Sequence, residues 1–247
     1  MSVAKREPIA EYDEFDQPEA EIDYPESDGQ PMAETDRHLQ TIIDLRFALR
    51  DFFRAIDERV YVGSNMLMYY VEGDQDKCVA PDVFIVRGVG NHERRTFKLW
   101  EEQHAPNVVI EISSRKTKKE DLNWKKQLYA WLGVREYFIF DPEYKLKPPL
   151  RAYRLHGGQY IEEAVTSGRV LSNELKLELV NTGKELRLRD PLTERLLLTS
   201  DEIAGAQRRA EAAQQAEAAA RQAAEAELAR LRAELAQLKR VAAKKRG

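Results

Sequence analysis

The sequence predicts a mixed α/β domain that lies between an acidic N-terminal arm and a helical C-terminal tail. Two observations support this. The middle of the chain alternates between helical and strand patterns, in the order helix, three strands, helix, strand and a β-rich end. Charge also changes along the chain: residues 1–36 hold 2 basic and 12 acidic side chains, whereas residues 37–200 hold 27 basic and 24 acidic ones. The net charge of −4 therefore conceals a mildly basic body.

The composition excludes several classes of protein. The single cysteine, Cys78, cannot form an internal disulfide or a cysteine-based structural zinc site. No apolar run approaches the roughly 18 residues that a membrane span needs. We therefore expect a cytoplasmic protein without a membrane segment.

The predicted N-terminal arm comprises residues 1–30. Pro8, Pro18 and Pro25 lie among many carboxylates and few apolar side chains, so this arm cannot bury enough surface to offset its chain entropy. We expect it to be flexible. An alternative is that the arm mimics phosphates and lies over a basic groove.

The predicted C-terminal tail comprises residues 201–247. It is rich in Ala, Glu, Gln and Arg and contains no proline, which predicts one long helix. Four leucines spaced 3, 4 and 3 apart form an a/d seam of about two heptads: Leu228, Leu231, Leu235 and Leu238. We expect a short coiled coil, with a partner bound through residues 204–247, although an exposed and unpaired helix is the alternative.

The domain between them is predicted over residues 31–200. Periodicity and turn residues predict its elements: a helix over 36–55, strands over 60–71, 79–86 and 108–113, a helix over 118–132, a strand over 136–141, and a hairpin over 151–165. Gly133 ends the second helix, and the Gly157-Gly158 pair turns the hairpin. Further short strands are expected up to Leu188, and the two helices are expected to pack against one sheet.

Two carboxylates interrupt strands that are otherwise apolar. Asp82 follows Pro81 in the second predicted strand, and Glu111 lies within Val108-Val109-Ile110-Glu111-Ile112 in the third. A carboxylate in such a strand is expensive to bury unless a cation or hydrogen bonds satisfy it. Two carboxylates on neighbouring strands are a natural divalent-metal site, because Mg²⁺ prefers carboxylate oxygens and water. The alternative is that each side chain points to solvent at a sheet edge.

A polar, basic turn follows Glu111 and leads into the second predicted helix. Ser113, Ser114 and Thr117 offer hydroxyls near the helix start, where anions are favoured. On the helix, Asp121, Lys125 and Tyr129 recur every four residues and share a face. The alternative for Asp121 and Lys125 is an ordinary surface ion pair.

These motifs resemble a known family. Pro81-Asp82, Glu111-Ile112-Ser113-Ser114 with Thr117, Asp121, Lys125 and Tyr129, then Gly133-Val134-Arg135-Glu136-Tyr137 and Asp141-Pro142 resemble the Uma-two family of endonucleases. That family is placed in the restriction-endonuclease-like PD-(D/E)XK superfamily. The resemblance covers about residues 30–200 and implies a restriction-endonuclease-like α/β core that cleaves DNA phosphodiesters with Mg²⁺ or Mn²⁺.

The resemblance also implies roles for particular residues. Asp82 and Glu111 match the metal-binding acids. The superfamily lysine would stand two residues after the second acid, where this chain has Ser113, and the resemblance suggests that Lys125 supplies the ammonium instead. Glu34 could add a third carboxylate to the metal site; alternatively, this segment only caps the first helix through Thr35 or Asp36.

The implied mechanism is hydrolysis of DNA by a cation-activated water. Asp82 and Glu111 would hold the cation, and Lys125 would orient the water or stabilise the developing charge. Basic side chains around the centre are expected to contact DNA phosphates: Arg94, Arg95, Lys98, Arg115, Lys116, Lys118 and Lys119. A homodimer is expected on general grounds, because two related sites can reach both strands. Two alternatives stay open: the basic residues are ordinary solvated charges, or the chain is a catalytically degenerate nuclease fold that binds nucleic acid or a protein and assembles through its C-terminal helix.

Overall fold

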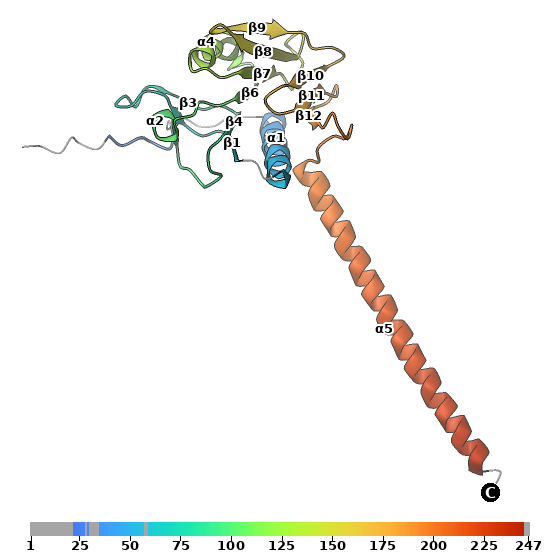
Figure 1. Cartoon of the computed structure of the whole chain (residues 1–247). Coiled ribbons are helices and arrows are strands. Elements are labelled where there is room, and N and C mark those ends of the chain that lie inside the picture. Colours follow the sequence, from blue (N-terminus) through green and yellow to red (C-terminus); the bar gives the residue numbers. More distant parts are fainter. Residues whose placement is uncertain (1–21, 28, 30–34, 57–58, 245–247) are drawn as a thin grey trace, which may run out of the picture.

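The computed structural model describes residues 22–27, 29, 35–56 and 59–244 (Figure 1). Its largest element besides the C-terminal helix is a six-stranded sheet. The strands lie in the spatial order β1 (Val60–Gly63), β4 (Val83–Arg87), β6 (Val108–Ile112), β7 (Glu136–Phe140), β8 (Leu150–His156) and β9 (Gln159–Glu163). β6 and β7 pair in parallel, and the other neighbours are antiparallel.

Two smaller sheets and five helices complete the described chain. One small sheet has the order β3 (Cys78–Val79), β2 (Met68–Tyr69) and β5 (Phe97–Lys98), and the other has the order β10 (Arg169–Ser172), β11 (Leu177–Asn181) and β12 (Leu186–Arg189). The helices are α1 (Asp36–Ala55), α2 (Leu99–Glu102), α3 (Lys118–Leu122), α4 (Trp124–Trp131) and α5 (Ser200–Lys244).

Both faces of the six-stranded sheet are covered, and this explains why its central strands are apolar without alternation. Along β6, Val108 and Ile110 join a core with α1 and the β10–β12 sheet. The intervening Val109 joins a second core, which contains Tyr129 of α4 and residues of the β2–β3–β5 sheet. A side chain on one face of β6 therefore faces α1, and a side chain on the other face lies in the core that contains α4.

Helix α1 has the predicted bounds, Asp36 to Ala55. Thr35 is its N-cap, because its hydroxyl accepts a hydrogen bond from the backbone N–H of His38. The buried face of α1, which includes Ile42, Leu45 and Leu49, covers the sheet. The prediction that Thr35 or Asp36 caps this helix is therefore confirmed at Thr35.

The structure differs from the sequence-based elements in three places. The predicted strand over 60–71 divides into β1 and β2, and the strand over 79–86 divides into β3 and β4, with each half in a different sheet. The predicted helix over 118–132 is interrupted at Asn123, whose φ of −119° and ψ of −91° are not helical. The sequence also did not predict β5 or α2.

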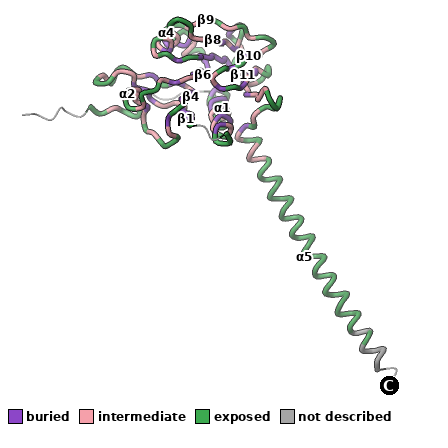
Figure 2. The backbone as a smooth tube through the Cα atoms, viewed as in Figure 1, coloured by how far each residue is buried: buried purple, intermediate pink, exposed green. Residues whose placement is uncertain are grey.

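Helix α5 runs away from the domain and is exposed along most of its length (Figure 2). It is joined to the domain at its start, where the hydroxyl of Ser200 donates to Asp44 of α1. The predicted long tail helix is confirmed. Leu228, Leu231 and Leu235 are each more than half exposed, whereas the side chain of Leu238 lies outside the described part of the chain.

Two further expectations concern the remaining segments. Residues 1–21 of the predicted arm lie outside the described residues, so the division into arm, domain and tail stays a prediction. Among the helices that the structure describes, none combines the length and apolar character needed to cross a membrane.

Candidate functional site

The two predicted carboxylates meet where β4 begins and β6 ends. Val83 pairs with Ile110 in the antiparallel register, so the preceding residue, Asp82, stands opposite Glu111. The backbone N–H of Ile112 donates to Asp82 Oδ2 at 2.6 Å. This bond satisfies one oxygen of Asp82 and ties its carboxylate to the strand that bears Glu111.

Glu111 lies in the core rather than in solvent. Glu111 is 1% exposed, and its carboxylate has two partners from α4: the hydroxyl of Tyr129 donates to Oε1 at 2.6 Å, and Lys125 Nζ lies 3.0 Å from Oε2. The alternative that Glu111 points to solvent at a sheet edge is wrong. Asp82 is less enclosed, with a side chain that is 13% exposed.

Lys125 joins two carboxylates. Its Nζ lies 3.0 Å from Glu111 and 3.1 Å from Asp121 Oδ1. Both Lys125 and Asp121 are buried, so the alternative of a surface ion pair is wrong. Tyr137 supports this arrangement from β7, because its hydroxyl donates to the backbone carbonyl of Asp121 at 2.9 Å.

The local electrostatics follow from three carboxylates around one ammonium. Burial raises the pKa of Glu111, and Asp82 and Asp121 add to that rise, while Lys125 and the hydroxyl of Tyr129 oppose it. Burial alone would lower the pKa of Lys125, but the neighbouring carboxylates, Glu111 foremost, outweigh burial and raise it. Lys125 is therefore a charged ammonium that lies between the carboxyl groups of Glu111 and Asp121.

His38 is a neighbour of this cluster that the sequence did not single out. Helix α1 places His38 Nε2 3.7 Å from Asp82 Oδ1, and the residue is buried. No metal-ligand spacing surrounds His38 in the sequence, so only the packing of α1 against the sheet brings it here.

Ser113 occupies the position at which the superfamily would have lysine. It is 1% exposed, and its backbone N–H donates to the carbonyl of Phe140 at 2.7 Å. Its hydroxyl has no hydrogen-bond partner among the described residues. Lys125, which reaches Glu111 from α4, is thus the ammonium next to the second acid.

The donor set fits a hard divalent cation in its chemistry. Mg²⁺ is commonly held by one or two carboxylates together with water and substrate phosphate, and Asp82 and Glu111 are two carboxylates on adjacent strands. Within the described ranges, no three His, Cys, Asp or Glu side chains are grouped to hold a metal. Glu34, the third expected ligand, lies outside the described residues.

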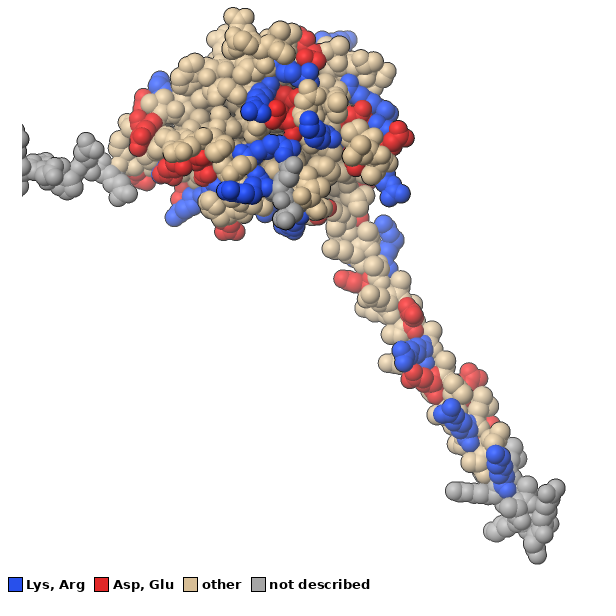
Figure 3. Space-filling view, viewed as in Figure 1, with Lys and Arg blue, Asp and Glu red and all other residues tan. Residues whose placement is uncertain are grey.

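The predicted basic residues fall into two groups. Four surround the start of α3 beside the carboxylate cluster and are wholly or partly accessible: Arg115, Lys116, Lys118 and Lys119. Arg95 and Lys98 lie at β5 and pair with Glu26 and Glu101. Figure 3 shows Lys and Arg side chains mixed with acidic ones over the face in view.

Arg94 lies inside the domain, where it cannot act as the predicted phosphate contact. Its side chain is only 4% exposed, its guanidinium bonds to Glu102, and it also donates to the carbonyl of Gly90 at 2.9 Å. It stacks over the ring of Tyr61, 4.3 Å from the centroid. These contacts occupy the guanidinium inside the domain, so the assignment of Arg94 to nucleic-acid binding is wrong.

The fold is that of a restriction-endonuclease-like α/β protein, with mixed sheets and flanking helices. Residues 9–187 match the family Uma2, described as "Putative restriction endonuclease", and the chain belongs to that family.

One similar solved structure is the crystal structure of "a putative nuclease belonging to DUF820" from Anabaena variabilis ATCC 29413. It is 14% identical, with a TM-score of 0.44, and the match covers 59% of this chain and 76% of that one. No curated protein matches the sequence.

Proposed function

We propose that this chain is a Mg²⁺- or Mn²⁺-dependent endonuclease that hydrolyses phosphodiester bonds of DNA. The observation that carries the proposal is the buried cluster in which the Lys125 ammonium lies between Glu111 and Asp121, with Asp82 opposite Glu111 on the adjacent strand. Strongly perturbed ionisable groups in such a cluster are typical of functional sites. Membership of a nuclease family supports the same class of reaction.

Each residue has a distinct role in this proposal. Asp82 and Glu111 hold the cation, which when bound polarises the phosphoryl group and lowers the pKa of a water molecule. Lys125 orients the attacking water or stabilises the negative charge that develops on the phosphate. Tyr129 fixes the orientation of Glu111 through its 2.6 Å hydrogen bond, and Asp121 holds the Lys125 ammonium from its other side.

The basic turn next to the cluster supplies the proposed contact with DNA. Arg115, Lys116 and Lys119 are exposed and follow Glu111 by only a few residues, and Lys118 is partly exposed. Contacts of this kind provide affinity by releasing counterions and carry no sequence information. The proposal therefore predicts DNA binding that weakens as salt increases.

The test compares the three proposed catalytic residues with a surface control. Asp82→Ala, Glu111→Gln and Lys125→Ala should each abolish cleavage of single-stranded, duplex and branched DNA, and circular dichroism should show that the fold persists. Glu72→Gln, at an exposed position, should leave cleavage unchanged. The proposal fails if the wild-type chain binds neither Mg²⁺ nor Mn²⁺ by calorimetry and cleaves none of these substrates.

A second candidate function is nucleic-acid or protein binding by a catalytically degenerate nuclease fold. Two observations favour it: Ser113 replaces the superfamily lysine, and the ammonium of Lys125 already pairs with Glu111. DNA binding that needs no divalent cation and survives Asp82→Ala, without any cleavage, would identify this function.

We further propose that the chain acts in the cytoplasm as a homodimer or with a helical partner, and that residues 204–247 make the contact. The exposed Leu228, Leu231 and Leu235 of α5 provide the seam. Sedimentation of a chain that ends at residue 203 tests this role, because the oligomeric state should change when the seam is removed.

A further inference from the structure

Helix α1 has an outward face that combines arginine with apolar side chains. At 3.6 residues per turn, six positions fall within about 100° of the helix circumference: Leu39, Ile43, Arg46, Phe47, Arg50 and Arg54. We call this the α1 arginine face. Its three apolar members are each at least 40% exposed, although they lie on a helix whose opposite face is core.

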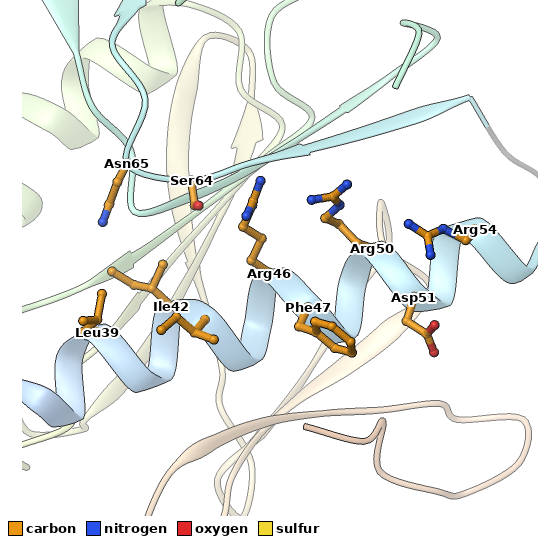
Figure 4. Close-up of a pocket in the computed structure, with 10 residues that line it drawn as sticks. Leu39, Ile42, Arg46, Phe47, Arg50, Asp51, Arg54, Ser64 and Asn65 are labelled. Atoms are coloured by element: carbon orange, nitrogen blue, oxygen red, sulfur yellow. The ribbon is translucent and has the colours of Figure 1, made fainter. Parts of the chain in front are cut away.

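A pocket of about 330 Å³ lies along this face, bounded on its far side by Ser64 and Asn65, which follow β1. Figure 4 shows Arg46, Arg50 and Arg54 rising from one side of the helix toward this strand, while Phe47 and Asp51 point away. Residues four apart on a helix repeat every 6 Å or so along its axis. That repeat is comparable with the separation of successive phosphates along a nucleic-acid strand.

The three arginines are not neutralised within the described part of the chain. No carboxylate there lies within ion-pair distance of Arg46, Arg50 or Arg54. The Nε atom of Arg46 is buried and has no hydrogen-bond acceptor among the described residues. Three guanidinium groups on one side of a helix, without a carboxylate partner in the described ranges, favour an anionic ligand that presents oxygen atoms.

The position of α1 relative to the carboxylate cluster favours nucleic acid over an acidic protein. His38, in the first turn of α1, lies 3.7 Å from Asp82, so the helix starts at the proposed catalytic centre. From His38, Arg46 lies about 12 Å and Arg54 about 24 Å farther along the helix axis. At roughly 3.4 Å per base pair, those distances correspond to about 3 to 7 base pairs.

We propose that the α1 arginine face binds the backbone of the nucleic-acid substrate on one side of the phosphodiester held at Asp82 and Glu111. This inference rests on the proposed nuclease function and adds the path that the substrate takes. Arg46, Arg50 and Arg54 contact phosphates along this stretch, and the apolar side chains of Leu39 and Ile43 beside them cover the sugars.

The test measures binding of the full chain to a fluorescently labelled duplex of about 30 base pairs, with EDTA present so that cleavage does not interfere. The variant Arg46→Gln/Arg50→Gln/Arg54→Gln should lose at least tenfold in affinity. The slope of log affinity against log salt should fall in magnitude by about 2.7, since each lost phosphate contact contributes about 0.9. The control Arg208→Gln/Arg209→Gln, at exposed positions of α5, should change neither quantity.

A second variant keeps the test informative if substitution of Arg46 causes the domain to misfold. Arg50→Gln/Arg54→Gln leaves the buried Nε in place and should lower the slope by about 1.8. If the wild-type chain binds the duplex and both variants bind with unchanged affinity and slope, the α1 arginine face does not bind DNA, while the proposed function stands. If the variants change only the sedimentation coefficient, the face is a protein interface and the inference is overturned. If the wild-type chain binds no duplex in EDTA and cleaves none with Mg²⁺ or Mn²⁺, the proposed function itself fails.

Discussion

The Lys125 ammonium lies 3.0 Å from the carboxylate of Glu111, although one residue belongs to a helix and the other to the central sheet. Both are buried, and Asp121 holds the same ammonium at 3.1 Å. A buried ion pair contributes little net stability, because desolvation offsets the attraction. The cluster is therefore not explained by stability alone, in keeping with the catalytic role proposed for it.

Removal of the ammonium should destabilise the domain. Lys125→Met leaves Glu111 and Asp121 buried without their cation, so the free energy of unfolding should fall by about 3–5 kcal/mol. Urea denaturation measures the change. Lys126→Met, one residue along the same helix, should cost less than about 1 kcal/mol, because that ammonium lies over the Tyr153 ring and pairs with no buried carboxylate in the part of the chain that the structure describes. Equal stability of Lys125→Met and wild type would contradict this account.

Substitution of two buried tyrosines should separate the positioning of Glu111 from the stability of the domain. Tyr129→Phe removes the hydroxyl that donates to Glu111, whereas Tyr137→Phe removes one that donates to the backbone of Asp121. Each should cost about 1–3 kcal/mol of unfolding free energy. Only Tyr129→Phe should also weaken Mn²⁺ binding by calorimetry, since it alone releases a proposed ligand. Equal metal affinity in the two variants would remove the positioning role of Tyr129.

Arg94 and the lysines around the start of α3 should respond in opposite ways. Arg94→Gln should lower the midpoint of thermal unfolding and leave the salt dependence of DNA binding unchanged, because its guanidinium is bonded inside the domain. Lys116→Gln/Lys119→Gln should leave the midpoint unchanged and reduce the salt slope by up to about 1.8. A reduced salt slope in a folded Arg94→Gln variant would restore Arg94 as a phosphate contact.

Glu102 makes part of the stability depend on pH. Hydrogen bonding to Arg94 lowers the pKa of Glu102 below its ordinary value of 4.5. A carboxylate with a lowered pKa stabilises the fold fully above that ordinary value, and this contribution is lost as pH falls through the folded-state pKa. The stability difference between wild type and Glu102→Gln should therefore be largest near neutral pH and shrink below about pH 4. A stability difference that grows as the pH falls would contradict the lowered pKa of Glu102.

Two glycines should respond oppositely to alanine. A Cβ at Gly63 would overlap the ring of Phe84 on the paired strand, so Gly63→Ala should cost about 1–3 kcal/mol in denaturation experiments. Gly205 lies in α5, where the nearest atom to a Cβ is the flexible end of Arg209, at 3.5 Å. Gly205→Ala should increase helicity and stabilise the helix by about 0.5–1 kcal/mol. A neutral Gly63→Ala would show that the ring moves aside.

Local patterns were sufficient to predict much of the fold. The apolar stripe and capping residues gave α1 its bounds, and Glu111 stood out because its apolar neighbours made a carboxylate costly there. The division of 60–71 and 79–86 between two sheets was not predictable, because an apolar run does not reveal which strands it pairs with. At the break, the side-chain amide of Asn123 donates to the carbonyl of Lys119 at 2.6 Å, a local hydrogen bond that competes with the helical backbone and that periodicity does not reveal.

The candidate site was also predicted only in part, because periodicity shows which side chains share a helix face but not which elements pack together. Periodicity placed Asp121, Lys125 and Tyr129 on one face, but only the fold brings His38 to Asp82. A loop arginine such as Arg94 looks the same in sequence whether it is solvated or buried, because its partners Glu102 and Tyr61 are fixed by packing. Sequence periodicity does not separate the exposed apolar side chains of the α1 arginine face from the buried ones of the same helix, because α1 carries apolar residues on both faces.

The shape of the chain affects how its mass would be measured. At 1.5 Å per residue, the 45 residues of α5 extend for about 68 Å beyond the domain. Such a projection increases hydrodynamic drag, so a 28.5 kDa monomer would elute from a gel-filtration column like a much larger globular protein. A monomer could thus be mistaken for a dimer, and light scattering, which reports mass independently of shape, is the appropriate measurement.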